Sequence, residues 1–335
     1  MIAETGVSIV DQLTGNFWLA ALLKTVGVLG FFLVVPLIVG YMEHKVLAHA
    51  QARLGPMEAG GFHGWAQLVA DGVKFIQKED VVPAAADRNV FSLAPAVAMI
   101  PYIVVLVVLP LGSDVFALNL DVGIFFVLAV SGIGVLGILM GGWASANKYA
   151  LIGAMRAAGQ LIAYELPLVF AAAGAVMLAG SMSLINIVEA QRDLWYVVPL
   201  FPLFVIFVIS SVAELSRPPF DMPIADSEII FGAFTEYSGL KFAFFLLAEY
   251  GGIVVLSGIT SVLFLGGYLP LPFIPLPGPI MMMGKIFALS FLVIWLRATF
   301  PRLREDQLQR FAWVSLLEIA LLWILVVAFA KVAMN

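Results

Sequence analysis

The sequence predicts an all-α integral membrane protein, a bundle of about eight transmembrane helices that forms a single membrane domain over residues 1–335. Hydrophobic residues make up 62% of the chain and charged residues 12%, about half of the roughly 25% charge of a soluble domain. The mean hydropathy is +1.06. A helix needs about 20 apolar residues to cross about 30 Å of hydrocarbon, and eight apolar runs are long enough.

The eight runs are expected to be helices, because a backbone in lipid must satisfy its own hydrogen bonds. In chain order they cover residues 17–42, 92–112, 122–146, 161–181, 195–214, 241–266, 280–301 and 311–330. The start of the chain lacks a positively charged signal region, so the first run is expected to stay as a span. Glycines in the third run indicate close helix packing.

The orientation follows from the basic residues in the connections between these runs. Only Arg192 and Lys331 belong to the even-numbered connections and the end of the chain. The odd-numbered connections hold eleven: Lys45, Arg53, Lys74, Lys78, Arg88, Lys148, Arg156, Arg217, Arg302, Arg304 and Arg310. We therefore expect the odd-numbered connections in the cytoplasm and both termini outside.

Two of the cytoplasmic connections are long, the first at residues 43–91 and the acidic fifth at residues 215–240. The first contains a short segment, residues 64–76, with apolar residues at helical spacing. Its apolar face is too short to span and predicts an interfacial helix. Because the outer connections are short, the long loops indicate a cytoplasmic docking partner.

Composition also excludes several kinds of site. The chain has no cysteine, so it has no disulfide, no thiolate iron–sulfur ligand and no Cys-type zinc site. Any electron-transfer centre must then belong to a partner. The net charge of −5 and the dispersed basic residues do not form a nucleic-acid surface. His44, His49 and His63 lack the spacing of a metal-binding pair, so no metal site is expected.

Four acids, Glu165, Glu214, Glu249 and Glu318, are predicted in the cytoplasmic half of their spans, while Lys24 and Lys285 fall near the opposite face. A charge in a span costs several kcal/mol unless it is paired, neutral or hydrated. The functional interpretation is a hydrated proton relay that enters from the cytoplasm. The alternative is a set of helix-end acids that reach water, or protonated packing groups.

The fifth connection combines a break with a cluster of charges. Two prolines after Arg217 turn the chain out of the fifth helix, which leaves Arg217 able to pair with a carboxylate, Asp221 being nearest in sequence. Asp221, Asp226 and Glu228 cannot all ionise cheaply in a partly desolvated pocket, so at least one is expected to have a raised pKa. The alternative is an ordinary solvated acidic loop.

Several stretches together resemble one family: the H subunit of respiratory complex I, the proton-pumping NADH-quinone oxidoreductase, with relatives in archaeal cofactor dehydrogenases and membrane-bound hydrogenases. The stretches are EHKVLAHAQARLGP (43–56), ADGVKFIQKED (70–80), FSLAP (91–95), NKYALIGAMRAAGQLIAYE (147–165), AELSRPPFD (213–221), SEIIFGAFTEYSG (227–239), FFLLAEY (244–250) and PRLREDQL (301–308). They cover all four cytoplasmic connections in order.

The resemblance implies a translocase subunit without a redox centre of its own, in the plasma (inner) membrane of a prokaryote rather than the mitochondrial inner membrane. It implies that the chain binds no cofactor and forms most of the tunnel for ubiquinone or menaquinone, the substrate of the complex. The implied partners are the peripheral-arm subunits that carry the terminal iron–sulfur cluster and the quinone head site, neighbouring small and antiporter-like membrane subunits, and the lipid quinone.

The resemblance also assigns residues. The quinone tunnel and subunit junction are matched by Arg53, Asp71, Arg217, Asp221, Asp226 and Glu228, and the proton relay by Glu165, Glu214, Glu249 and Glu236. The chain departs from the family pattern at four places, one of which is Glu58, where a basic or neutral polar residue is common. His44 stands where Arg is usual, Ile224 replaces an acid and Asp226 shortens another, which leaves Glu228 as the unaltered acid of that loop.

Three alternatives remain open at this point. One is the ion-translocating anchor of a related deazaflavin dehydrogenase or membrane-bound hydrogenase. An independent transporter would use the same acids without needing cytoplasmic partner subunits. A purely structural anchor would keep coupling when Glu165, Glu214 and Glu249 are neutralised together.

Overall fold

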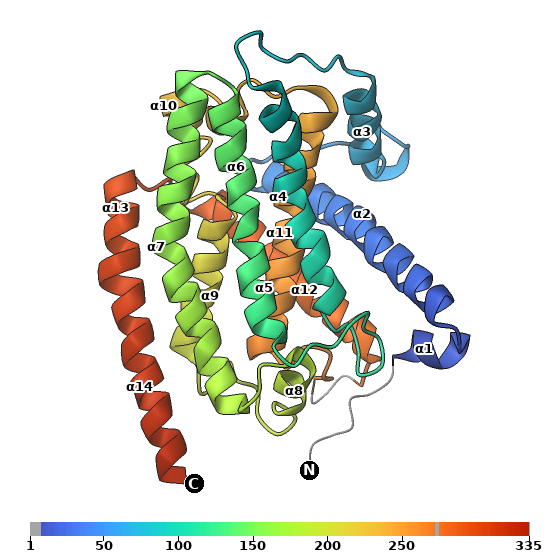
Figure 1. Ribbon diagram of the computed structural model, residues 1–335, viewed down its shortest axis with the longest axis vertical. Helices are drawn as coiled ribbons and strands as arrows, with labels where there is room; N and C mark the ends of the chain where they lie inside the picture. Colours follow the sequence, from blue (N-terminus) through green and yellow to red (C-terminus); the bar gives the residue numbers. More distant parts are fainter. Residues whose placement is uncertain (1–7, 272–274, 335) are drawn as a thin grey trace.

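The structure is a computed structural model that describes residues 8–271 and 275–334. In this part of the chain, α-helices form a bundle along one long axis (Figure 1). The elements are α1 (Ile9–Thr14), α2 (Phe17–Ala50), η1 (Phe62–Gly64), α3 (Gln67–Gln77), α4 (Arg88–Val108), α5 (Gly123–Ser131), α6 (Ile133–Ala144), α7 (Lys148–Ala179), α8 (Leu184–Glu189), α9 (Phe201–Glu214), α10 (Asp226–Ile229), η2 (Gly232–Phe234), α11 (Gly239–Phe264), α12 (Gly278–Thr299), α13 (Glu305–Arg310), the π-helix η3 (Phe311–Leu316) and α14 (Leu317–Met334).

The all-α membrane fold is confirmed. Among the described residues, seven helices are long and apolar enough to cross a membrane: α2, α4, α5 continued by α6, α7, α11, α12, and α13 continued through η3 into α14. The fifth predicted span is shorter than expected, because α9 has 14 residues. At about 1.5 Å per residue it covers about 21 Å. A turn occupies residues 196–200, and a proline at the first turn of α9 marks where the helix begins.

Local sequence signals define several helix starts. The side-chain oxygens of Asn16, Asp87 and Asn147 accept backbone N–H groups at the beginning of α2, α4 and α7, as N-cap residues do. Two helices are longer than the apolar runs predicted. α2 continues to Ala50 and α7 begins at Lys148, so both extend into what the sequence predicted as loops.

The centre of the bundle is α11, which packs against α2, α4 and α12. Its second half is buried almost without interruption from Gly251 to Phe264. Glycine allows this close packing at Gly252, where a Cβ would lie 2.4 Å from Cδ2 of Leu215 and 3.1 Å from the ring of Tyr102. The face of α11 therefore lies directly against the end of α9 and against α4.

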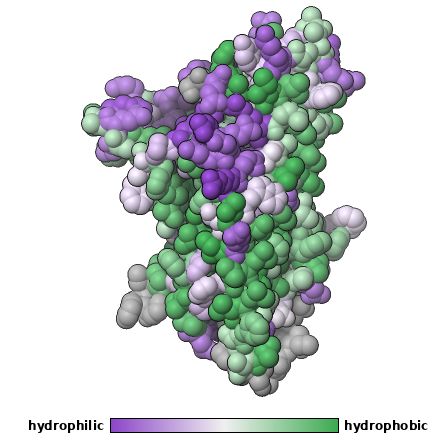
Figure 2. Space-filling model, turned by 90° about the vertical axis from the view of Figure 1, so that its left-hand side faces the viewer, coloured by the Kyte–Doolittle hydropathy of each residue, from purple (hydrophilic) through white to green (hydrophobic). Residues whose placement is uncertain are grey.

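The two ends of the bundle differ. We call the end that carries α3 and α10 the α3 end, and the end that carries α1 and α8 the α8 end (Figure 1). The end of α14 also lies at the α8 end. In the view of Figure 2, hydrophilic residues gather toward the α3 end, whereas a largely hydrophobic surface covers the part below it. Trp65, Val69, Val73 and Ile76, in and just before α3, are exposed, which suits an interfacial helix.

Candidate functional site

The site is built around Arg217, which lies in the turn that follows α9. Its Nη1 donates to Oε2 of Glu43 on α2, and its Nε lies 2.6 Å from Oε1 of Glu249 on α11. Arg297 on α12 donates to the other oxygen of Glu43. We call these four residues, Glu43, Arg217, Glu249 and Arg297, the buried charge cluster. It joins three helices and one turn at a single point.

Burial makes this cluster unusual. Arg217 and Glu43 are each 1% exposed, and the Arg217 guanidinium also lies 4.8 Å from the ring centroid of Tyr250. Removing such ions from water costs several kcal/mol each, which is offset only by close, well-directed partners. Two cations and two anions are present, so the cluster can be electrically neutral. A proton added to either carboxylate would upset that balance.

A small cavity connects Glu249 to a second acid. It has a volume of about 40 Å³, and its lining includes Tyr102, Glu214, Glu249 and Leu215. A water molecule needs about 10–15 Å³ and polar partners, and both are present here. Glu214, at the end of α9, is 8% exposed. The two carboxyl groups therefore face one space that is large enough for water.

A third acid lies beyond Glu214. Ser131 lies close to Glu214, and its hydroxyl donates to the carbonyl of Leu128. Ser131 directly precedes Gly132, where a Cβ would lie 3.2 Å from Oε1 of Glu165. Glu165 on α7 is exposed on the side of the bundle. We call Glu249, Glu214 and Glu165 the acid line. It crosses the bundle from the buried charge cluster to the surface of α7.

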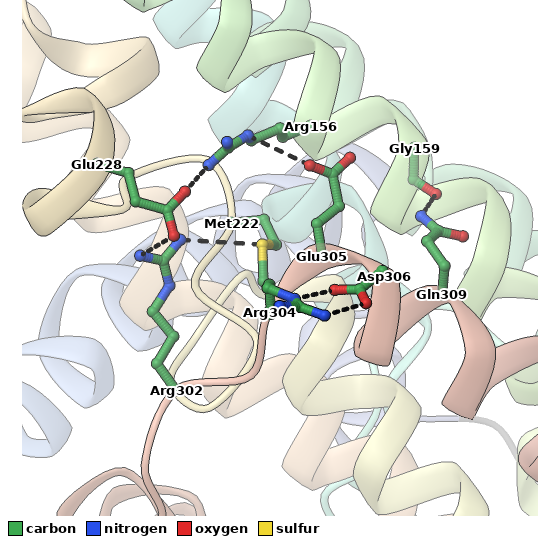
Figure 3. A network of polar contacts seen from close by, with 9 residues as sticks. All are labelled: Arg156, Gly159, Met222, Glu228, Arg302, Arg304, Glu305, Asp306 and Gln309. Carbon is green, nitrogen blue, oxygen red and sulfur yellow. Dashed lines mark hydrogen bonds and ion pairs between the residues drawn. The ribbon is translucent and has the colours of Figure 1, made fainter.

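The remaining predicted residues do not join this line. Figure 3 shows Glu228 on α10 in a separate group, where it contacts Nη1 of Arg156 at 2.5 Å and Nη1 of Arg302 at 3.5 Å. Arg156 also lies 3.4 Å from Glu305. We call Arg156, Glu228, Arg302 and Glu305 the surface charge cluster. The hydrogen bond from Arg156 lowers the pKa of Glu228, and the charge of Arg302 adds to this against the opposing effect of burial.

The other loop residues are placed separately. Arg53 is exposed and donates to Gln51, and Oε1 of Glu236 accepts from Asn147 at 2.6 Å.

Asp71 on α3 contacts Lys74 at 2.6 Å. Burial acts to raise the pKa of Asp71, but hydrogen bonds from Lys74 and Gln67 outweigh it and lower that pKa.

Two further residues complete the predicted quinone-side set. Asp221 is half-buried in the turn after Arg217. Asp226 is the first residue of α10, and its side chain lies outside the described part of the structure. Arg217 pairs with carboxylates, as expected, but the two that it contacts are Glu43 and Glu249, which are far from it in sequence. Both lie on helices that the fold brings to the turn.

Sequence reasoning missed three residues of the site: Glu43, Arg297 and Tyr102. A signal for two of them was present, because Arg297 falls inside an apolar run and Glu43 directly follows one. A cation and an anion at the same depth of two neighbouring spans are candidates for a pair. Tyr102 offered no such signal. Within the described residues, no group of three His, Asp or Glu side chains could hold a metal ion.

The fold and this site define the class of the protein: a multi-pass α-helical membrane protein with a line of ionisable groups that runs from its interior to the surface of α7. The model of the NADH dehydrogenase family matches residues 23–328. The NADH-quinone oxidoreductase H subunit of Anoxybacillus flavithermus is 46% identical over 324 residues, 96% of this chain and 97% of that protein. The corresponding protein of Geobacillus kaustophilus is 47% identical over 290 residues, 86% of this chain and 87% of that protein.

The chain therefore belongs to the NADH dehydrogenase family, and the resemblance stated from its sequence motifs is confirmed. It is a membrane subunit of an oxidoreductase complex, and other subunits of that complex are its partners. The bacterial relatives and the seven long apolar helices make it a multi-pass prokaryotic membrane protein.

Proposed function

We propose that this chain forms the quinone tunnel of a complex I type NADH-quinone oxidoreductase, at the junction with the peripheral arm, and the start of its proton-coupling channel. Its α3 end faces the cytoplasm and its α8 end faces the outside of the plasma membrane. The basic residues of the odd-numbered connections support this orientation. The donor, the redox centres and the quinone head site belong to partner subunits, because a chain without cysteine has no thiolate cluster ligand.

The observation that carries the proposal is the position of Arg217. Its guanidinium contacts Glu43 on one side and Glu249 on the other, so it joins the turn of the acidic loop to the first member of the acid line. A quinone that is reduced to quinol takes up two electrons and two protons. Charge that appears near the turn during this reaction acts on Arg217 through a poorly screened interior.

The proposed coupling step is a change in the partner of Arg217. When the guanidinium moves toward new negative charge, Glu249 loses its cation and takes up a proton, because a buried carboxyl without a partner favours its neutral form. Water in the 40 Å³ cavity carries the proton to Glu214, and Ser131 leads on to Glu165. Glu165 is exposed on α7, where a neighbouring membrane subunit receives the proton.

The test is Glu249→Gln in the assembled complex, reconstituted into vesicles. Quinone reduction and proton uptake are measured side by side with wild type. We expect coupled proton uptake to fall by at least about tenfold, because general acid–base groups contribute roughly 10²-fold or more to proton transfer.

Glu318→Gln is the matched control. Glu318 lies in α14 and is exposed on the outside of the bundle, so its loss is expected to leave both rates unchanged. If Glu249→Gln leaves quinone reduction and proton uptake at wild-type values in an intact complex, the proton route through α11 is wrong.

A further inference from the structure

Lys285 on α12 is a buried cation that the acid line does not use. It is 9% exposed and lies near the α8 end, two turns into its helix. Its Nζ donates to the carbonyl oxygens of Leu265 at 2.7 Å, Gly267 at 2.7 Å and Leu269 at 2.9 Å. It also lies 4.3 Å from the ring centroid of Trp195.

These contacts fit a charged ammonium. A lysine ammonium has three N–H donors and no acceptor, and here each donor has one carbonyl. The carbonyls belong to the end of α11 and the segment after it, where unpaired backbone oxygens and the helix dipole favour a cation. Trp195 adds a cation–π contact. The positive charge is therefore fixed in position at the α8 end of α11.

A row of hydroxyl groups leads toward this charge. Ser257, Ser261 and Leu265 follow one another at four-residue spacing, from α11 into its C-cap, and each lies about 40° further around the helix axis than the one before. Ser257 also accepts a hydrogen bond from Ser290 of α12 at 3.3 Å. At about 1.5 Å per residue, Ser257 lies about 12 Å from Glu249 along the helix, and Leu265 about 12 Å further on.

A second cavity lies beside Ser257 of this row. It has a volume of about 20 Å³, and Ser211, Ser257 and Thr260 are among its lining residues, so it has room for one water molecule. The buried Ser211 hydroxyl has no hydrogen-bond partner in the described part of the chain. Leu215 lines both this cavity and the one that holds Glu214 and Glu249. The cavity of the acid line and the cavity beside the hydroxyl row therefore share Leu215 as a wall residue.

We propose that Lys285 is an electrostatic seal: its fixed ammonium closes the α8 end of a hydroxyl-lined path between α9, α11 and α12, and keeps protons of the acid line from leaking out. The inference rests on the proposed function in that it takes the acid line to hold mobile protons. A fixed cation in a narrow polar path excludes protons by repulsion, as charged groups do in selective water pores.

The test measures passive proton flow through the resting complex, with neither donor nor quinone added. The assembled complex is reconstituted into vesicles that contain a pH-sensitive dye, and a pH gradient is imposed. We expect Lys285→Met to raise the leak by roughly tenfold or more, because a unit charge a few ångströms away strongly opposes a second one at an effective dielectric of about 20.

Two variants establish the route. Ser257→Val in the Lys285→Met background is expected to return the leak to near the wild-type rate, because one methyl group replaces the hydroxyl and a second takes up space beside the second cavity. Lys331→Met is the matched control. Lys331 lies near the same end on α14 and donates to the carbonyl of Met177, away from the hydroxyl row, so the leak is expected to stay at the wild-type rate.

The outcomes are separable. An unchanged leak in an intact Lys285→Met complex, or a leak that Ser257→Val leaves untouched, overturns the seal. If Lys285→Met does not assemble, Lys285→Gln keeps donors for two of the carbonyls and is tested in the same way. Failure of both to assemble assigns Lys285 a purely structural role and also overturns the proposal. Since no turnover is involved, this result is independent of Glu249→Gln, which tests coupling.

Discussion

The buried and surface charge clusters contain the same chemical groups in different surroundings. Each pairs two arginines with two glutamates, and each joins a loop to helices. In the buried cluster, the side chains of Arg217 and Glu43 are each 2% exposed. In the surface cluster, Arg156 is 21% exposed and Glu228 is 45% exposed (Figure 3). In the buried cluster, water reaches Arg297, which is 38% exposed, and Glu249, which is 23% exposed, but not the contact between Arg217 and Glu43.

The difference decides what each cluster can do. An exposed ion pair contributes about 0–1 kcal/mol, because water and salt screen it. A buried pair gains little net stability, yet loss of one partner leaves an uncompensated charge in a medium that solvates it poorly. The buried cluster therefore responds strongly to one proton or one displaced cation. The surface cluster holds α10 and α13 near α7, with little consequence for the charge balance inside.

The largest expected effect comes from Arg217→Gln. This change leaves Glu249 without its cation and Glu43 with Arg297 alone, so we expect a loss of about 3–5 kcal/mol in stability. Thermal unfolding in detergent, followed by circular dichroism, measures the loss, and the yield of assembled complex gives a second reading. The stability of Arg217→Lys is expected to lie between those of wild type and Arg217→Gln, because lysine keeps the positive charge but lacks the planar guanidinium.

The comparison between the clusters also bears on what the sequence can predict. Hydropathy located the spans, because the free-energy cost of placing a residue in lipid depends on that residue and its own helix and not on distant parts of the chain. The two prolines after Arg217 correctly marked the end of α9. The partners of Arg217 were not predictable in this way. Glu43 is 174 positions away, and only the packing of α2 against α11 brings it to the turn.

The acid line shows the same division. Glu214 and Glu249 were predicted from the cost of an acid in a span, and they share one cavity. Glu228 was predicted to share a pocket with Asp221 and Asp226, and in the structure it contacts Arg156 and Arg302. Glu236, which was assigned to the proton relay, accepts a hydrogen bond from Asn147. Exposed loop side chains are less constrained by burial, so sequence proximity says little about their partners.

A smaller effect is expected from Arg156→Gln, which tests the surface cluster directly. The change removes the 2.5 Å contact to Glu228 and the 3.4 Å contact to Glu305. Because both carboxylates remain accessible to water, we expect a loss of no more than about 1 kcal/mol, measured by the same thermal unfolding. A loss equal to that of Arg217→Gln would contradict the distinction between the clusters.

The smallest effect is the pH dependence that Glu228 contributes. The pKa of Glu228 is lowered from its ordinary value of 4.5, mainly by the hydrogen bond from Arg156. A carboxyl group whose pKa is lower in the folded state stabilises the fold while it is ionised. Its contribution is therefore complete above about pH 4.5 and is lost as the pH falls through the lowered pKa of the folded state.

The measurement compares the midpoint of thermal unfolding of wild type with that of Glu228→Gln across this pH range. Wild type is expected to be the more stable at neutral pH, by an amount within the range of about 0–1 kcal/mol for exposed pairs. The unfolding midpoints of wild type and Glu228→Gln should become equal as the pH falls. At neutral pH, added salt should reduce the difference between them, because salt screens exposed charges. A difference that grows as the pH falls would mean that the protonated form of Glu228 stabilises the fold. In that case Glu228 would belong with the groups that exchange protons, which would contradict the distinction between the buried and surface charge clusters.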